Sequence, residues 1–108
     1  MTGARRRILF MAEAATLAHV TRPLVLAQAL DQARHEVHFA CAPGYERFFA
    51  DTAFTHWPLW SIPPQQFLEA LARGRPLYDQ ATLERYIEAD LEVLDAVKPD
   101  LVVGDFRL

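Results

Sequence analysis

The sequence has a single cysteine, only four glycines and no excess of basic residues. Cys41 has no second cysteine with which to form a disulfide within the chain, and no set of Cys and His residues has the spacing of a zinc site. Eleven Lys and Arg stand against fourteen Asp and Glu, a formal net charge of -3, whereas phosphate-backbone binding needs a basic excess. The sequence therefore predicts no structural metal, no nucleic-acid partner and a reducing, cytoplasmic setting.

Long hydrophobic runs are also missing. The longest segment without Asp, Glu, Lys or Arg, residues 52–68, contains three prolines and two glutamines, which is wrong for a helix that crosses a membrane. The arginines at 5–7 precede only a five-residue apolar run, too short for a secretory signal. We expect neither a membrane span nor a targeting peptide.

What is present fits one ordinary α/β domain. The chain has 108 residues, of which 52% are hydrophobic and 23% charged. A chain of this length buries about two thirds of the surface that its unfolded form exposes, which is enough for one core but leaves little for a second lobe.

The first half of the chain predicts two strands around one helix. Residues 8–12 are a continuous apolar run, typical of a strand buried on both faces of a parallel sheet. Val20, Leu24, Ala27 and Leu30 form a helical stripe over residues 20–34, with Pro23 in the first turn. In residues 36–42 the side chains at 37, 39 and 41 are apolar and alternate with those at 38 and 40, a pattern that predicts a second strand.

The second half predicts helices between two further strands. We expect a short helix at 45–50, a weak edge strand at 54–60 that contains a proline, and a helix at 65–73 that Gly74 ends. The longest helix spans 79–98, and residues 101–103 form a fourth buried strand. The apolar face of the longest helix comprises Leu83, Ile87, Leu91, Leu94 and Val97.

This order of elements predicts a Rossmann-like parallel sheet with strand order 3-2-1-4, flanked by helices. The first and fourth strands are then neighbours, and the crevice beyond their carboxyl ends is where such folds bind ligands. His19 and Asp105 both fall at this edge.

Four segments together resemble one family: RRRILFMAE at 5–13, LAHVTRPLVLAQAL at 17–30, HEVHFACAPGY at 35–45 and KPDLVVGDFRL at 98–108. Their order and spacing resemble the opening of GT-B type, nucleotide-sugar-dependent glycosyltransferases such as the UDP-glycosyltransferases. The resemblance implies two Rossmann-like lobes, with residues 1–108 an incomplete, acceptor-side N-terminal lobe and the donor-binding lobe absent. It implies no cofactor, since the nucleotide sugar is a substrate held mainly by the other lobe.

By the same resemblance, His19 is the general base and Asp105 its orienting partner. A sugar acceptor hydroxyl needs a group with a pKa near neutrality to take its proton, and a histidine meets this need when a carboxylate fixes its other ring nitrogen. One base and no covalent intermediate imply inversion at the anomeric carbon. Ala18 replaces the usual glycine, so close approach of a phosphate to this turn is not expected.

Other residues have two interpretations each. In one interpretation, an acceptor pocket is lined by Glu13, Trp57, Trp60 and Phe67. In the other, the glutamate is a solvated charge at the end of a strand and the aromatic residues belong to the core. The alternative interpretation of His19 is a histidine at a helix end whose ring nitrogens are hydrogen-bonded to the backbone or to solvent. The rival function is a non-catalytic, Rossmann-like binding or oligomerisation module, and uncovered sheet surface predicts a homo-oligomer in either case.

Overall fold

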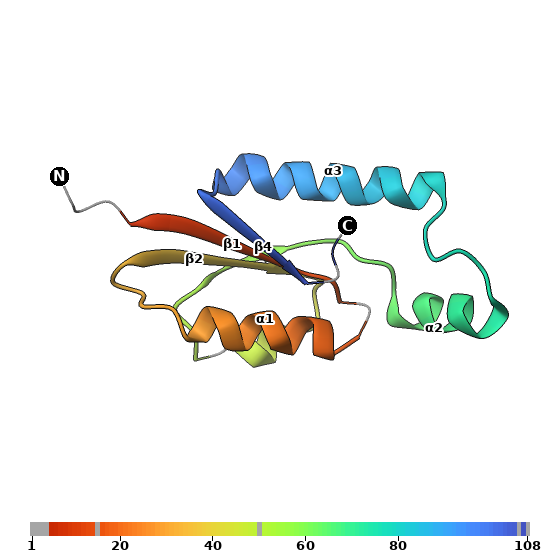
Figure 1. Cartoon of the computed structure of the whole chain (residues 1–108), viewed down its shortest axis with the longest axis horizontal. Helices are drawn as coiled ribbons and strands as arrows, with labels where there is room; N and C mark the ends of the chain where they lie inside the picture. Colours follow the sequence, from red (N-terminus) through yellow and green to blue (C-terminus); the bar gives the residue numbers. More distant parts are fainter. Residues whose placement is uncertain (1–4, 15, 50, 106, 108) are drawn as a thin grey trace.

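The computed structural model describes residues 5–14, 16–49, 51–105 and 107, and these form a parallel α/β sheet with helices on both faces (Figure 1). The sheet has the order β3-β2-β1-β4, and every pairing is parallel. The predicted fold class and strand order are therefore confirmed. The elements are β1 (Arg6–Ala12), α1 (Ala18–Gln28), β2 (His35–Cys41), the 3-10 helix η1 (Glu46–Phe49), β3 (Thr55–Pro58), α2 (Pro64–Arg73), α3 (Gln80–Val97) and β4 (Leu101–Asp105).

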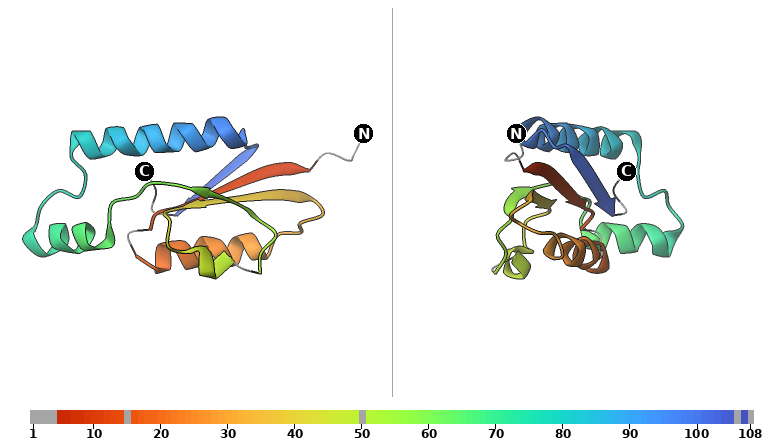
Figure 2. Two further views of the ribbon diagram at one scale, coloured as in Figure 1. Left: turned by 180° about the vertical axis from the view of Figure 1, so that it is seen from behind. Right: turned by 60° about the vertical axis from the view of Figure 1, so that its left-hand side comes forward.

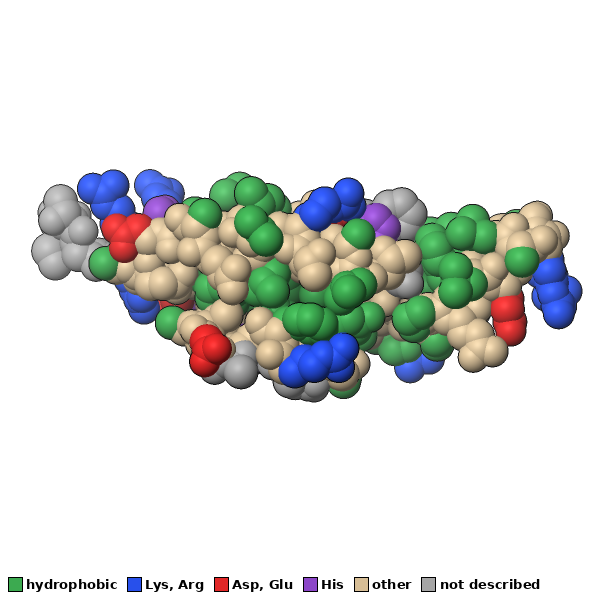
Figure 3. Space-filling model, turned by 90° about the horizontal axis from the view of Figure 1, so that it is seen from below, with side chains coloured by type: hydrophobic (Ala, Val, Ile, Leu, Met, Phe, Trp, Pro, Cys, Tyr) green, Lys and Arg blue, Asp and Glu red, His purple; other side chains and the backbone are tan. Residues whose placement is uncertain are grey.

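The layers are unequal in length. Helix α1 and η1 cover one face of the sheet and α3 covers the other, whereas α2 lies beyond the carboxyl ends of the strands (Figures 1 and 2). The molecule is accordingly elongated, with extents of 54 × 25 × 17 Å. Two leucines on α2, Leu68 and Leu71, are exposed. Apolar side chains gather on the face of the molecule that Figure 3 shows.

Strand β1 is central, which explains its continuous apolar sequence. It pairs with β2 on one side and with β4 on the other. Ile8 and Phe10 belong to the core on the α1 face, and Leu9 and Met11 belong to the core under α3. From Ile8 onward the strand is buried on both faces, which favours apolar side chains at every position, whereas Arg6 and Arg7 at its start are exposed.

Helix α1 follows the predicted stripe with different ends. Val20, Leu24 and Ala27 are buried, as expected. The helix begins at Ala18, because backbone bonds from the N–H groups of residues 19 and 20 close a turn ahead of Pro23. The expectation that Pro23 lies in the first turn is therefore wrong. The turn before α1 includes Ala15, and the short helix expected at 45–50 includes Ala50; both residues lie outside the described part of the chain.

Two expectations about burial in the second half are wrong in part: Val97 is buried and Leu94 packs against the core as expected, but other predicted core positions are exposed. Helix α3 buries Tyr86, Val93 and Val97, whereas Leu83, Ile87 and Leu91 are exposed. The first half of α3 runs past the carboxyl edge of the sheet (Figure 1), so the predicted stripe has no apolar surface to cover there. Among the described residues, β4 is an edge strand that pairs with β1 alone, and Leu101 is consequently 54% exposed and Val102 44% exposed.

Helix α2 ends at the predicted glycine, and α3 begins with a capping residue that was not predicted. Gly74 caps α2 with φ 63°, in the left-handed region that glycine adopts without steric cost. Asp79 caps α3, and its carboxylate accepts a 2.8 Å bond from the backbone N–H of Thr82. That bond lowers the pKa of Asp79.

Candidate functional site

The carboxyl edge of β1 and β4 brings His19 and Asp105 together. Ala12 at the end of β1 is in register with Asp105 at the end of β4, and His19 lies in the first turn of α1 directly beyond this edge. Nδ1 of His19 is 3.3 Å from Oδ1 of Asp105, and both side chains are largely buried. The structure thus brings together the two residues that were expected at this edge, and their catalytic roles stay a prediction.

Arg22 completes this cluster, and the sequence analysis missed it. Its Nε donates to Oδ2 of Asp105 at 2.9 Å, and its Nη2 donates to Oδ1 at 2.7 Å. The same Nη2 is 2.9 Å from Nδ1 of His19. Position 22 is three residues after position 19 and therefore on the same helix face, which is the signal that could have identified it.

The arginine also changes the electrostatics of the carboxylate. Its hydrogen bonds are the main cause of a pKa of Asp105 below the ordinary range, and the contact with His19 acts in the same direction. The carboxylate in turn raises the pKa of Arg22. Asp105 is thus held as an anion between two nitrogen groups, the state required of a group that orients a histidine.

Glu13 lies beneath this edge rather than on an open cavity. Its side chain is fully buried, and its Oε2 accepts a 2.6 Å bond from the hydroxyl of Tyr86 and a 3.5 Å bond from that of Tyr78. Its Oε1 has no hydrogen-bond partner among the described residues, although the guanidinium of Arg107 is within 3.5 Å. Glu13 is therefore placed to hold structure together, and none of the clefts described below reaches it.

Arg107 is the second residue that the sequence analysis missed. It follows β4, its side chain is only 3% exposed, and it donates to Asp90 of α3 at 2.6 and 2.9 Å. It also donates to the carbonyl of Trp60 and the hydroxyl of Ser61, and it lies over the ring of Tyr86. This buried guanidinium joins the segment after β4, helix α3 and the loop between β3 and α2.

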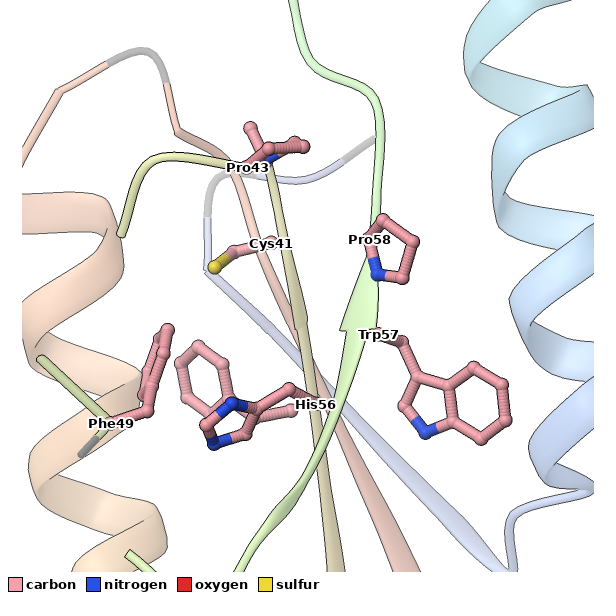
Figure 4. Close-up of a pocket in the computed structure, with 8 residues that line it drawn as sticks. Cys41, Pro43, Phe49, His56, Trp57 and Pro58 are labelled. Atoms are coloured by element: carbon pink, nitrogen blue, oxygen red, sulfur yellow. The ribbon is translucent and has the colours of Figure 1, made fainter. Parts of the chain in front are cut away.

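The aromatic candidates divide between a cleft and the core. Trp57 points to the α3 side of β3, opposite His56 (Figure 4), and its indole N–H donates to Nδ1 of His38. Trp57 and Trp60 line a mainly apolar cleft of about 390 Å³ between this segment and α3. Phe67 is instead buried with Ile62 and Tyr86. A smaller cleft of about 150 Å³ has Cys41, Phe49 and His56 among its lining residues (Figure 4).

Ion and membrane features are few in the described part of the chain. Residues 5–14, 16–49, 51–105 and 107 contain no group of three side chains able to hold a metal ion. In the same ranges, no helix combines the length and the apolar character needed to cross a membrane.

The chain resembles glycosyltransferases of PGL/p-HBAD biosynthesis. It is 55% identical over 104 residues to a PGL/p-HBAD biosynthesis rhamnosyltransferase of Mycobacterium bovis, a match that covers 96% of this chain and 23% of that protein. A PGL/p-HBAD biosynthesis glycosyltransferase of Mycobacterium tuberculosis is 50% identical over 104 residues, or 24% of its length. The chain thus spans about a quarter of the length of these curated relatives.

A third relative qualifies the comparison. An inactive PGL/p-HBAD biosynthesis glycosyltransferase of Mycobacterium bovis is also 50% identical over 104 residues, which are 28% of its length. Similarity in this segment therefore does not by itself separate active from inactive proteins. No protein-family model matches the chain, and no solved structure matches it.

Proposed function

We propose that this chain is the acceptor-side part of a GT-B type glycosyltransferase, which moves a sugar from a nucleotide-sugar donor to a hydroxyl acceptor. The observation that carries the proposal is the contact between His19 and Asp105 at the carboxyl edge of two adjacent parallel strands. This is the edge where open α/β sheets bind ligands. Similarity over 96% of the chain to glycosyltransferases supports the same reaction class.

In the proposed reaction, His19 acts as general base through Nε2. The acceptor hydroxyl loses its proton to Nε2 while its oxygen attacks the anomeric carbon, and the bond to the nucleoside diphosphate breaks with both electrons leaving on the phosphate oxygen. Asp105 stabilises the resulting imidazolium at Nδ1. A single displacement of this kind inverts the anomeric configuration.

The proposal divides the work between two lobes. The nucleotide sugar is a substrate, and we propose that it binds mainly to a donor-binding lobe that is not part of residues 1–108. The relatives are about four times as long as the matched segment, which leaves room for such a lobe in them. The 108-residue chain alone is then inactive, because positioning two substrates together supplies much of the rate.

We propose that the acceptor's apolar part lies in the cleft that Trp57 and Trp60 line. Aromatic faces and an apolar wall suit a flat or aliphatic acceptor. Glu13 and Phe67 are buried and line neither cleft, so we propose no direct contact between them and the acceptor. An activated rhamnose is the first donor to test, because one relative is named a rhamnosyltransferase.

A chimera tests the proposal. This chain replaces the matching segment of the Mycobacterium bovis rhamnosyltransferase, and transfer is measured with that protein's own substrates. We expect transfer, and we expect His19→Ala to lower kcat by about a hundredfold or more, the usual scale of general-base catalysis. Asp105→Asn should also lower kcat with the fold intact.

The matched control is His35→Ala, since His35 begins β2 at the opposite edge of the sheet. It should leave kcat unchanged. A folded chimera without any transfer, beside an active parent, would overturn the proposed function. A His19→Ala chimera as fast as the unmodified one would overturn only the assignment of the base.

The inactive relative supports a second candidate, a non-catalytic binding or oligomerisation module. The exposed edge of β4 offers unpaired backbone groups beside Leu101 and Val102, which favours pairing with a second copy. Light scattering discriminates here: a concentration-dependent homodimer together with an inactive chimera favours the module, and a monomer with an active chimera excludes it.

A further inference from the structure

The cluster at the carboxyl edge contains a conflict over one nitrogen atom. Nδ1 of His19 is 3.3 Å from the carboxylate oxygen Oδ1 of Asp105, which only accepts hydrogen bonds when ionised. It is also 2.9 Å from Nη2 of Arg22, which only donates. A single ring nitrogen either carries a proton or has a lone pair, so it cannot satisfy both neighbours.

The distances indicate that Nδ1 of His19 forms its hydrogen bond with Arg22 rather than with Asp105. Its contact with Nδ1 is 0.4 Å shorter than the contact of the carboxylate (3.3 less 2.9 Å). Asp105 is already satisfied by two bonds from Arg22, at 2.7 and 2.9 Å, and does not depend on the imidazole for a donor. In this arrangement Nδ1 accepts, and the proton of the neutral ring is on Nε2.

We propose that Arg22 is a positioning residue that determines which ring nitrogen of His19 carries the proton. The inference rests on the proposed function, in which Nε2 must have a lone pair to accept the hydroxyl proton. With Arg22 against Nδ1, the ring has the opposite tautomer and is not a base. When the guanidinium leaves Nδ1, the ring can donate from Nδ1 to Asp105 and Nε2 becomes the acceptor.

Movement of Arg22 is compatible with its surroundings. Its side chain is 61% exposed, whereas those of His19 and Asp105 are 16% and 20% exposed. A long exposed side chain can turn away without opening the core. The two buried partners remain facing each other at the strand end. Arg22 is thus the member of the cluster most exposed to solvent, and its displacement would remove the contact with Nδ1.

Nitrogen-15 NMR of the imidazole tests this in the chain itself, because a ring nitrogen with a proton and one with a lone pair have well separated chemical shifts. The spectra are taken in alkaline buffer, where an ordinary histidine is neutral. We expect the Nε2-protonated form of His19 in the unmodified chain and the Nδ1-protonated form in Arg22→Gln. The matched control, Arg34→Gln, changes an exposed arginine directly before β2 and should leave the tautomer unchanged.

A second readout comes from the carboxylate. Loss of the arginine's bonds should raise the pKa of Asp105 in Arg22→Gln towards the ordinary value, measured by carbon-13 NMR of the carboxyl group. Arg22→Met serves where the glutamine variant does not give a native spectrum. The same His19 tautomer in the unmodified chain and in a folded Arg22 variant would overturn the inference. No sugar transfer is needed for this result, so it is separate from the chimera assay, which alone decides whether His19 is the base.

Discussion

Replacing Tyr86 by phenylalanine removes one oxygen atom that has two buried partners. The hydroxyl donates to Oε2 of Glu13 at 2.6 Å and accepts the backbone N–H of Ile62 at 3.0 Å, and the side chain is only 3% exposed. A hydrogen bond to a charged group contributes about 1.5 to 3 kcal/mol, and an N–H left buried without a partner costs about 1 to 3 kcal/mol. The ring is retained, so no large cavity forms. We expect Tyr86→Phe to lower the free energy of unfolding by roughly 3 to 5 kcal/mol.

Tyr78→Phe is the matched control for this prediction. Its hydroxyl donates to the same carboxylate oxygen, but at 3.5 Å and from a half-buried side chain. A bond at the limit of hydrogen-bond distance contributes little, so the loss should stay below about 1 kcal/mol.

Urea unfolding of both variants, followed by circular dichroism, measures the difference. With a slope of about 1 to 2 kcal/mol per molar urea, the urea midpoint of Tyr86→Phe should fall by roughly 1.5 to 5 M, against less than about 1 M for Tyr78→Phe. Equal midpoints for the two variants would refute the reasoning, because the substitutions are chemically identical and differ only in the contacts described.

Three further predictions concern pH and backbone geometry. Burial raises the pKa of Tyr86, so its contribution to stability is full below about pH 10 and is lost as the pH rises further. One of the three tyrosines should therefore ionise only as the circular dichroism signal of the folded chain is lost. Ionisation of all three tyrosines before unfolding would contradict this prediction. The hydrogen bonds from Arg22 lower the pKa of Asp105, so its contribution is present above the ordinary value near 3.9 and is lost as the pH falls through the lowered one. Asp105→Asn should accordingly flatten the acid side of the curve of urea midpoint against pH, and an unchanged slope would count against the ion pair. Gly74→Ala places a side chain at φ 63° and should cost about 1 kcal/mol, whereas Gly104→Ala, whose added carbon meets its nearest atom at 3.8 Å, should change the urea midpoint little.

Local pattern predicted most of the fold, because most of the elements follow from short-range preferences. The apolar run of β1 predicts a buried strand, and the glycine after α2 predicts the end of a helix. The face that α3 buries was not predictable in the same way. Apolar residues at 83, 87 and 91 form a good helical stripe, but the position of the helix along the sheet decides which face is covered, and position along the sheet is a tertiary property.

The site was predictable only as far as topology determines it. His19 and Asp105 could be placed together because parallel strands 1 and 4 must end at the same edge. Arg107 could not be placed, because its partners Asp90, Trp60, Ser61 and Glu13 lie on separate segments that only the tertiary fold brings together. An arginine side chain is also usually solvated. The three-residue spacing between His19 and Arg22 could have predicted that Arg22 joins this cluster, but no apolar pattern distinguishes it from other surface arginines.

The pairing of β4 with β1 has a consequence for synthesis on the ribosome. The bond that begins this pairing joins Arg7 to Asp100, 93 residues later in the chain. At about 5 to 20 residues per second, roughly 5 to 20 seconds pass between the appearance of the two partners. During that interval the apolar strand at the centre of the final sheet has one open edge, which is a template for pairing with other chains. Nascent chains that stall before residue 101 should thus be the aggregation-prone species of this protein, and they are the stage at which a chaperone has most to protect.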